Sequence, residues 1–357
     1  MSGLDALLDQ DRPVRLLTSA VTSGNLPHAF LFTGPEGVGK KTAARTLAML
    51  LNCRCRTCIQ KSFPDQEGEN AYGQNLPAPC QECTACRKML SSNHPDLHWL
   101  TPSGSYIKVD QVRELCGRLS LKPHEAKIRL AVIEDAHTLN PESGNTLLKI
   151  LEEPPQKTLF ILLARQASEL LPTIVSRCRH IRFNPVSAES IKAHLQNRWE
   201  MDAAEAEGIA AMAGGSLSRA AEMREKNWID RRNWIIESLA EISRVPRNCQ
   251  LAFAEALARG DAGRVPTALE IMKSWYRDLA VYEYAPDRLI NRDLKNKITK
   301  ESGQYKLPQL IAITRAIDEA AINMEKNANV RLALDQLILQ IASKGSRDNG
   351  ENHWYPV

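Results

Sequence analysis

Residues 34–42 read Gly-Pro-Glu-Gly-Val-Gly-Lys-Lys-Thr, and this stretch decides the fold of the first half of the chain. The pattern is that of a phosphate-binding loop, in which glycines let backbone N–H groups surround phosphates and a lysine reaches them. The next residue normally supplies a hydroxyl to Mg²⁺, but here it is Lys41, whose ammonium has no lone pair for a metal. Thr42 lies about 100° further round the helix. The pattern predicts a degenerate nucleotide site formed by Gly34, Gly37, Gly39, Lys40, Lys41 and Thr42.

Strand and helix signals alternate on both sides of this loop. Apolar runs typical of buried parallel strands lie at 26–32, 128–133, 158–163 and 181–183. Helical patterns lie between them at 41–51, 109–119 and 140–153, the last of which ends at Pro154-Pro155 because proline cannot continue a helix. Such alternation predicts an α/β domain with a parallel sheet over residues 1–185.

After Pro185 the patterns are all helical. They divide into a small helical unit at 186–243 and a larger one at 244–342, followed by a polar tail at 343–357 that we expect to be flexible. A length of 357 residues agrees with two or three domains of about 150 residues each.

Composition excludes several classes of protein. The net charge is only +4 and aromatic residues make up 5%, which argues against an extended nucleic-acid-binding surface. No run of about 18 apolar residues occurs, and the acidic start of the chain is unlike a signal peptide. We therefore expect a protein of the cytoplasm, a reducing compartment in which disulfides are rare.

Six of the nine cysteines crowd into positions 53–86. Cys80, Cys83 and Cys86 follow a C-x₂-C-x₂-C pattern, and Cys53 is a candidate fourth thiolate; four thiolates form a closed, structural zinc site. Cys55-x-x-Cys58 is a rival pair, so spacing alone does not settle the ligands. An iron–sulfur cluster is the alternative, but no cysteine followed by proline occurs downstream, which favours zinc.

Two further features bear on phosphate chemistry. The strand at 128–133 ends in Glu134-Asp135, where a nucleotide hydrolase has the reverse order, Asp-Glu, to hold Mg²⁺ and orient water. The order found here indicates either a catalytic base that is misplaced with respect to the attacking water, or simply an acidic strand end. Ser176-Arg177-Cys178 follows the strand at 158–163; taken alone, Arg177 is most simply a solvated charge at a helix end.

Several short motifs follow one another along the chain. They are Leu26-Pro27-His28-Ala29-Phe30-Leu31, the glycine loop, Cys53, the Cys80–Cys86 triplet, His94-Pro95-Asp96, Val109-Asp110-Gln111-Val112-Arg113, Asn145-Thr146-Leu147-Leu148-Lys149, Leu151-Glu152-Glu153-Pro154-Pro155, Ser176-Arg177-Cys178, Gly215-Ser216-Leu217 and Asn327-Ala328-Asn329. Their order resembles the clamp-loader subunits of bacterial DNA polymerase III, which belong to the AAA+ family. The match is most specific over residues 10–185 and weaker beyond.

The resemblance implies an AAA+ α/β domain at 1–185 with a zinc module at about 53–90, a helical lid at 186–243 and a helical collar at 244–342. Through the collar, five subunits of the family form a ring. The resemblance also implies that zinc is held by Cys53, Cys80, Cys83 and Cys86, and that Arg177 is an arginine finger acting on ATP bound to a neighbouring subunit.

Departures from the family pattern separate its two kinds of subunit. The gamma/tau motor has a Lys-Ser/Thr pair, an Asp-Glu strand end, a threonine-containing sensor and a second sensor arginine. This chain has Lys41, Glu134-Asp135, Arg165 and Ser218 at those places, with Arg219 one residue late. The intact Ser-Arg-Cys beside four departures favours the delta-prime type, which lends its finger and is not expected to hydrolyse ATP.

The resemblance then implies a function in loading the sliding clamp onto primed DNA, as part of a DNA polymerase holoenzyme. Expected partners are gamma/tau and delta subunits in a hetero-pentameric ring, the clamp, and DNA bound without sequence preference. Whether ATP or ADP is retained stays open, because the glycines and Lys40 are intact. The competing hypotheses are a gamma-like ATPase that uses Lys40, Thr42, Glu134 and Asp135, and a zinc-dependent nucleic-acid-binding module with a vestigial loop.

Overall fold

The computed structural model describes residues 3–55, 78–259, 264–326 and 328–345. The loop predicted at 61–77, the rival ligand Cys58, Asn327 and the tail beyond residue 345 lie outside these ranges. The described residues fall into two compact units: one runs to residue 191 and includes 214–219, and the other comprises 192–213 and the residues from 220 onward. No helix within the described ranges is long and apolar enough to cross a membrane.

The first unit is built on a parallel sheet of five strands in the order β2-β3-β4-β1-β5. Their bounds are β1 Ala29–Thr33, β2 Leu97–Leu100, β3 Arg129–Ile133, β4 Thr158–Ala164 and β5 Arg179–Arg182. β1, β3 and β4 are buried along their whole length, as expected of strands covered on both faces. The strand β1, which lies between β4 and β5, leads directly into the glycine loop, so that the loop lies at the carboxyl edge of the sheet, where α/β folds bind ligands.

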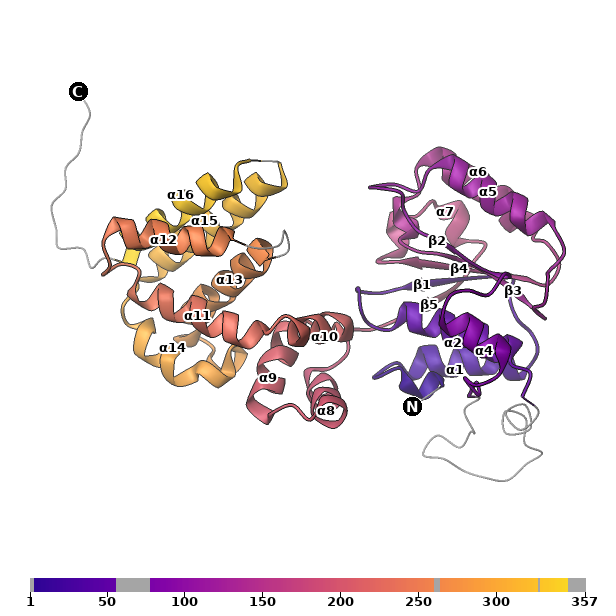
Figure 1. Ribbon diagram of the computed structural model, residues 1–357, viewed down its shortest axis with the longest axis horizontal. Helices are drawn as coiled ribbons and strands as arrows, with labels where there is room; N and C mark the ends of the chain where they lie inside the picture. The colour runs from indigo at the N-terminus through magenta and orange to yellow at the C-terminus, as the bar shows by residue number, and fades with distance from the viewer. Residues whose placement is uncertain (1–2, 56–77, 260–263, 327, 346–357) are drawn as a thin grey trace. The chain divides into compact units, whose positions relative to one another are not determined.

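Helices cover both faces of this sheet, as Figure 1 shows for α1, α2 and α4 on one side and α5, α6 and α7 on the other. Their bounds are α1 Asp11–Thr22, α2 Lys40–Asn52, α4 Thr84–Leu90, α5 Val109–Ser120, α6 Pro141–Glu152 and α7 Pro172–Val175. Because side chains alternate along a strand, Phe30 and Phe32 of β1 pack into the first core and Leu31 into the second. Two separate apolar cores therefore hold the sheet in place.

The rest of the chain is helical over its described residues. Its helices are α8 Ala188–Trp199, α9 Ala203–Met212, α10 Leu217–Glu225, α11 Trp228–Glu241, α12 Arg247–Ala258, α13 Arg264–Tyr282, α14 Lys295–Ser302, α15 Leu307–Glu325 and α16 Val330–Gly345. The core of the second unit includes Trp275 and Tyr276 of α13, which are fully buried. A buried Asp278 accepts N–H groups of Ile290 and Asn291 and so fastens the turn after α13.

The predicted fold class, an α/β domain with a parallel sheet followed by helices, is confirmed. The main difference lies at the end of the chain, where α16 continues to Gly345 although a tail was predicted from residue 343. Elements that the sequence analysis did not predict are α1, β2, α4 and α14. β2, for example, has the sequence Leu-His-Trp-Leu, which is too short and too polar to form an apolar run.

Candidate functional site

The glycine loop has the backbone conformation that its glycines permit. Gly34, Gly37 and Gly39 have φ angles of 142°, 73° and 103°, in the region that side chains disfavour. A Cβ atom at Gly34 would come within 2.4 Å of the Phe183 carbonyl oxygen, and one at Gly37 within 2.0 Å of the Ser216 Oγ. Glycine is thus required at Gly34 by strain and by the Phe183 backbone, and at Gly37 by strain.

Lys40, which would reach the phosphates of a nucleotide, bonds to its own loop. Its Nζ donates to the Gly34 carbonyl and, at 2.7 Å, to the Pro35 carbonyl. Burial lowers the pKa of this ammonium, and the nearby carboxylates of Glu36 and Asp135 partly offset that effect. The ammonium is therefore satisfied by backbone carbonyls of the loop.

Lys41 pairs with the carboxylate at the end of β3. Its Nζ lies 2.5 Å from Oε2 of Glu134, whose side chain is only 13% exposed, whereas that of Lys41 is 63% exposed. The next residue, Asp135, has a φ of 46° and begins the short 3-10 turn Ala136–Thr138. A largely exposed ammonium thus pairs with one of the two carboxylates at the end of β3.

The other departures from the family pattern also lie against the loop. Arg165 forms an ion pair of 2.7 Å with Glu36, and its carbonyl accepts the Gly34 N–H at 3.0 Å. This side-chain bond lowers the pKa of Glu36 and raises the pKa of Arg165. The Leu217 N–H donates to the Gly37 carbonyl at 3.0 Å, which places Ser218 next to Gly37. An ion pair and backbone hydrogen bonds from segments far away in the sequence therefore hold the loop in place.

Arg177 follows the short helix α7. Its Nη2 lies 2.7 Å from Oε1 of Glu152, and its Nη1 donates to the Thr173 carbonyl at 3.0 Å. The side chain is 36% exposed. Cys178 beside it packs on the second core, and burial raises the pKa of its thiol to about 12. The guanidinium is thus accessible while the backbone next to it is anchored.

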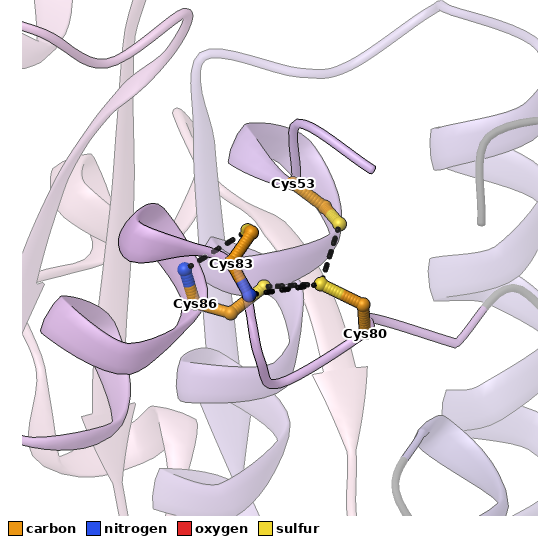
Figure 2. A group of neighbouring side chains, drawn as sticks. All are labelled: Cys53, Cys80, Cys83 and Cys86. Atoms are coloured by element: carbon orange, nitrogen blue, oxygen red, sulfur yellow. Dashed lines mark hydrogen bonds between the residues drawn. The ribbon is translucent and has the colours of Figure 1, made fainter. Parts of the chain in front are cut away.

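Cys53, Cys80, Cys83 and Cys86 come together at the end of α2 and the start of α4, as Figure 2 shows. Their four sulfurs lie within 4.8 Å of one another; the distances from Cys80 are 3.6 Å to Cys53 and 3.9 Å to Cys86. A tetrahedral zinc with Zn–S bonds of about 2.3 Å needs sulfurs about 3.8 Å apart. The donor set and its spacing therefore fit a structural zinc ion. Among the described residues Cys55 is not part of this cluster.

The thiols of this cluster differ in acidity. Burial opposes ionisation of Cys83, yet bonds from the backbone N–H groups of Arg54 and Cys86 and from neighbouring thiols hold its pKa at about 6. Burial raises the pKa of Cys86 far above the ordinary value. A metal must displace the protons that remain, since thiolates are the ligands.

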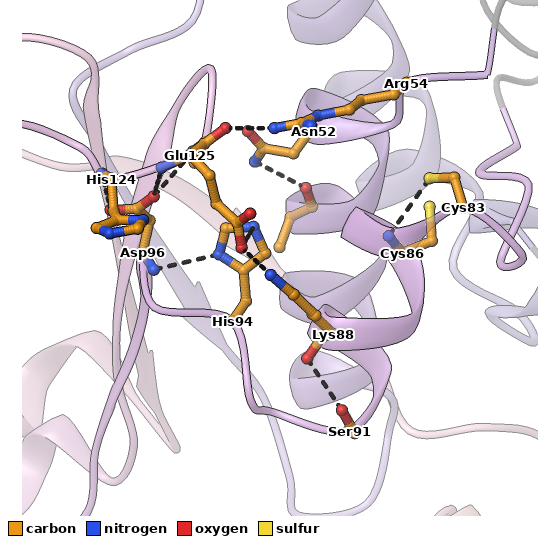
Figure 3. A network of polar contacts seen from close by, with 12 residues as sticks. Asn52, Arg54, Cys83, Cys86, Lys88, Ser91, His94, Asp96, His124 and Glu125 are labelled. Carbon is orange, nitrogen blue, oxygen red and sulfur yellow. Dashed lines mark hydrogen bonds and ion pairs between the residues drawn. The ribbon is translucent and has the colours of Figure 1, made fainter.

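A polar network joins the cysteine cluster to the loop before β3 (Figure 3). Lys88 of α4 forms an ion pair of 2.6 Å with Glu125, and Arg54, next to Cys53, donates to the Glu125 carbonyl at 2.8 Å. Nδ1 of His94 accepts the N–H of Asp96, so that its proton lies on Nε2, 3.7 Å from Glu125. The cluster is thereby fastened to the sheet.

Asp96 holds the same loop from the other side. Its carboxylate is buried and accepts three backbone N–H groups, those of His124, Glu125 and Ala126, at 2.7–2.8 Å. Although burial opposes ionisation, these bonds lower the pKa of Asp96. Three donors converging on one carboxylate explain an aspartate at this place in His94-Pro95-Asp96.

Comparison with known proteins decides the family. The model described as "DNA polymerase III, delta subunit" matches residues 9–187, and the corresponding C-terminal model matches residues 226–343. The chain belongs to the DNA polymerase III delta subunit family. The subunit delta' of Bacillus subtilis is 29% identical to it over 342 residues, which are 93% of this chain and 96% of that protein.

Gamma subunits resemble this family member over a shorter length. The gamma subunit of Buchnera aphidicola subsp. Baizongia pistaciae is 30% identical over 191 residues, which are 54% of this chain and 46% of the relative. Among solved structures, a gamma subunit-related protein of Thermotoga maritima is 16% identical at a TM-score of 0.43, and covers 95% of this chain and 100% of its own. Of these two sequence relatives, the delta' subunit matches nearly the whole length of the chain and the gamma subunit about half, as the sequence resemblance predicts.

Some residues of this delta-family chain had no sequence signal for the contacts they make. Glu125 lies in no motif, and its link to Lys88 joins residues 37 positions apart. Glu152 belongs to a recognised motif, but nothing in the sequence pairs it with Arg177. The sequence also gives no sign that Lys41 pairs with Glu134, since each is interpreted as a separate departure from the family pattern.

Proposed function

We propose that this chain is a delta-prime-type subunit of the DNA polymerase III clamp loader, which lends Arg177 to the ATP site of a neighbouring subunit and does not hydrolyse ATP itself. The observation that carries the proposal is the ion pair between Lys41 and Glu134. The pair neutralises a carboxylate at the place where a hydrolase binds Mg²⁺. Its positive partner, Lys41, stands at the position whose hydroxyl normally ligates that ion.

The remaining contacts of the loop support the same conclusion. Lys40 is bonded to loop carbonyls, Glu36 to Arg165 and the Gly37 carbonyl to Leu217. A nucleotide that uses Lys40 would have to replace the bonds from this lysine to the loop carbonyls, and the residue directly after Lys40 has no hydroxyl to ligate its magnesium. The loop then serves the fold as a junction between β1, the end of β4 and the segment 214–219.

Arg177 supports the second half of the proposal. A partly exposed arginine side chain on an anchored backbone suits a group that must reach a phosphoryl oxygen on another subunit. The four cysteines would hold a structural zinc ion through Cys53, Cys80, Cys83 and Cys86. Residues 1–185, 186–243 and 244–342 would form the α/β domain, the lid and the collar of a ring with gamma/tau and delta subunits that places the sliding clamp on primed DNA.

The test is the ATPase of a ring reconstituted with an Arg177→Ala variant. An arginine finger acting in trans accelerates phosphoryl transfer by about 10³- to 10⁵-fold at its site, so that turnover depending on that site falls sharply. Ring assembly, measured by gel filtration, should not change. Arg179→Ala is the matched control, because Arg179 is an exposed arginine two residues away. Wild-type turnover by the Arg177 variant would disprove the assignment.

A gamma-type ATPase is the second candidate. It is favoured by the intact glycine conformations and by the carboxylates of Glu134 and Asp135 at the end of β3. Under this alternative the purified chain hydrolyses ATP, and Lys40→Ala abolishes the activity. Absence of turnover above that of Lys40→Ala would exclude it.

A further inference from the structure

The Leu151-Glu152-Glu153-Pro154-Pro155 motif takes no part in the function proposed above. Glu152 is the last residue of α6, which must end there because two prolines follow. Its side chain is 52% exposed, and one of its carboxylate oxygens lies 2.7 Å from Nη2 of Arg177. The helix therefore ends with a carboxylate directed at the arginine that we assign as the finger.

A second contact holds the other side of the same guanidinium. Nη1 of Arg177 donates to the Thr173 carbonyl at 3.0 Å and lies 3.4 Å from the Ser176 Oγ. Both terminal nitrogens thus have a partner within the chain. Two anchors on different elements, α6 and α7, define the plane of the guanidinium. Arginine has five N–H donors, so these contacts still leave donors for an anion.

The backbone below the guanidinium is also fixed. The Arg177 N–H donates to the Ile174 carbonyl at 3.1 Å, and the Cys178 N–H donates to the Val175 carbonyl at 3.2 Å. Ile174 is 1% exposed and belongs to the second core, to which Leu151 of α6 also belongs. The backbones on both sides of the Glu152–Arg177 pair are therefore anchored next to residues of the same apolar core.

We infer that Glu152 is a positioning residue for Arg177: it holds the guanidinium in one orientation before a neighbouring nucleotide arrives. The inference rests on the proposed role of Arg177. A free arginine side chain has many rotamers and loses that freedom when it binds, so holding it in advance favours the bound geometry. The pair is exposed and weak, so that the guanidinium can still adjust to a phosphoryl group.

The experiment compares rings containing Glu152→Ala, Glu152→Gln, Arg177→Ala or both Glu152→Ala and Arg177→Ala. From the strength of exposed ion pairs, Glu152→Ala should lower kcat about two- to fivefold. The ATP KM should stay the same, because the finger acts in the transition state. Glu152→Gln should restore part of the loss, since its amide oxygen still accepts a hydrogen bond. In the Arg177→Ala background, Glu152→Ala should have no further effect.

Glu153→Ala is the matched control, because it removes the same charge from the adjacent, exposed position and should leave kcat unchanged. Unchanged or increased turnover with Glu152→Ala, while Arg177→Ala reduces it, overturns the positioning role and leaves the finger intact. A further loss from Glu152→Ala in the Arg177→Ala background shows that Glu152 acts elsewhere. Wild-type turnover with Arg177→Ala removes both proposals.

Discussion

Replacing Lys41 by methionine tests whether its charge stabilises the loop by neutralising Glu134. Methionine matches the apolar stem of lysine as far as Cε but has no charge to pair with a carboxylate. An exposed ion pair contributes about 0.2–1 kcal/mol, and Lys41 is 63% exposed, so solvent screens most of its attraction. Glu134 is only 13% exposed and is left poorly hydrated when its partner is removed, which puts the coupling at the upper end, about 1 kcal/mol.

The assay is urea denaturation of the wild type, Lys41→Met, Glu134→Gln and the double variant. Each single change should lower the free energy of unfolding by about 1 kcal/mol, and the double variant should lose no more than one of them. Lys226→Met is the control, because Lys226 pairs with Glu222 on a helix surface where both side chains are about 60% exposed. A coupling energy below about 0.3 kcal/mol, the usual error of additivity, would refute the stabilising role of the pair.

Three further predictions concern the elements around the site. Asp96→Asn should cost about 2 kcal/mol at pH 7, because one carboxylate accepts three N–H groups. Since the pKa of Asp96 is lowered in the folded protein, this stabilisation is present above the ordinary pKa of 3.8 and is lost as the pH falls through the folded pKa. Urea denaturation at pH values from 7 to 3 should show the free energies of unfolding of the wild type and Asp96→Asn converging, and a constant difference would contradict this. If the protein is first loaded with zinc, chelation of the metal should speed amide exchange at residues 122–128, which Lys88 and Arg54 contact, and leave exchange at 29–33 unchanged. Mass spectrometry measures the exchange, and an equal change in both segments would argue against the link. Arg129→Met should cost about 2–4 kcal/mol by calorimetry, because this buried side chain donates to the carbonyls of Arg118 and Leu121 at the end of α5, and an unchanged Tm would count against that cap.

Sequence alone determined the features that depend on local pattern. Apolar runs between helical patterns specified the parallel α/β domain, because buried strands and amphipathic helices have different periods. The glycines at 34, 37 and 39 indicated a phosphate-binding loop, and their positive φ angles in the structure agree with that pattern. Cysteine spacing indicated a metal site, since three thiols in seven residues have few other uses.

Tertiary structure alone decided which of these residues meet. Spacing left Cys55 beside Cys53 as a rival ligand and the family resemblance implied Cys53; the approach of α4 to the end of α2 brings Cys53 into the described cluster. Lys41 and Glu134 are read from sequence as two defects, but the order of strands brings them together as an ion pair. Glu152 and Arg177 likewise meet because α6 and α7 pack on one core. Long-range pairing depends on how the elements pack, and no local pattern contains that information.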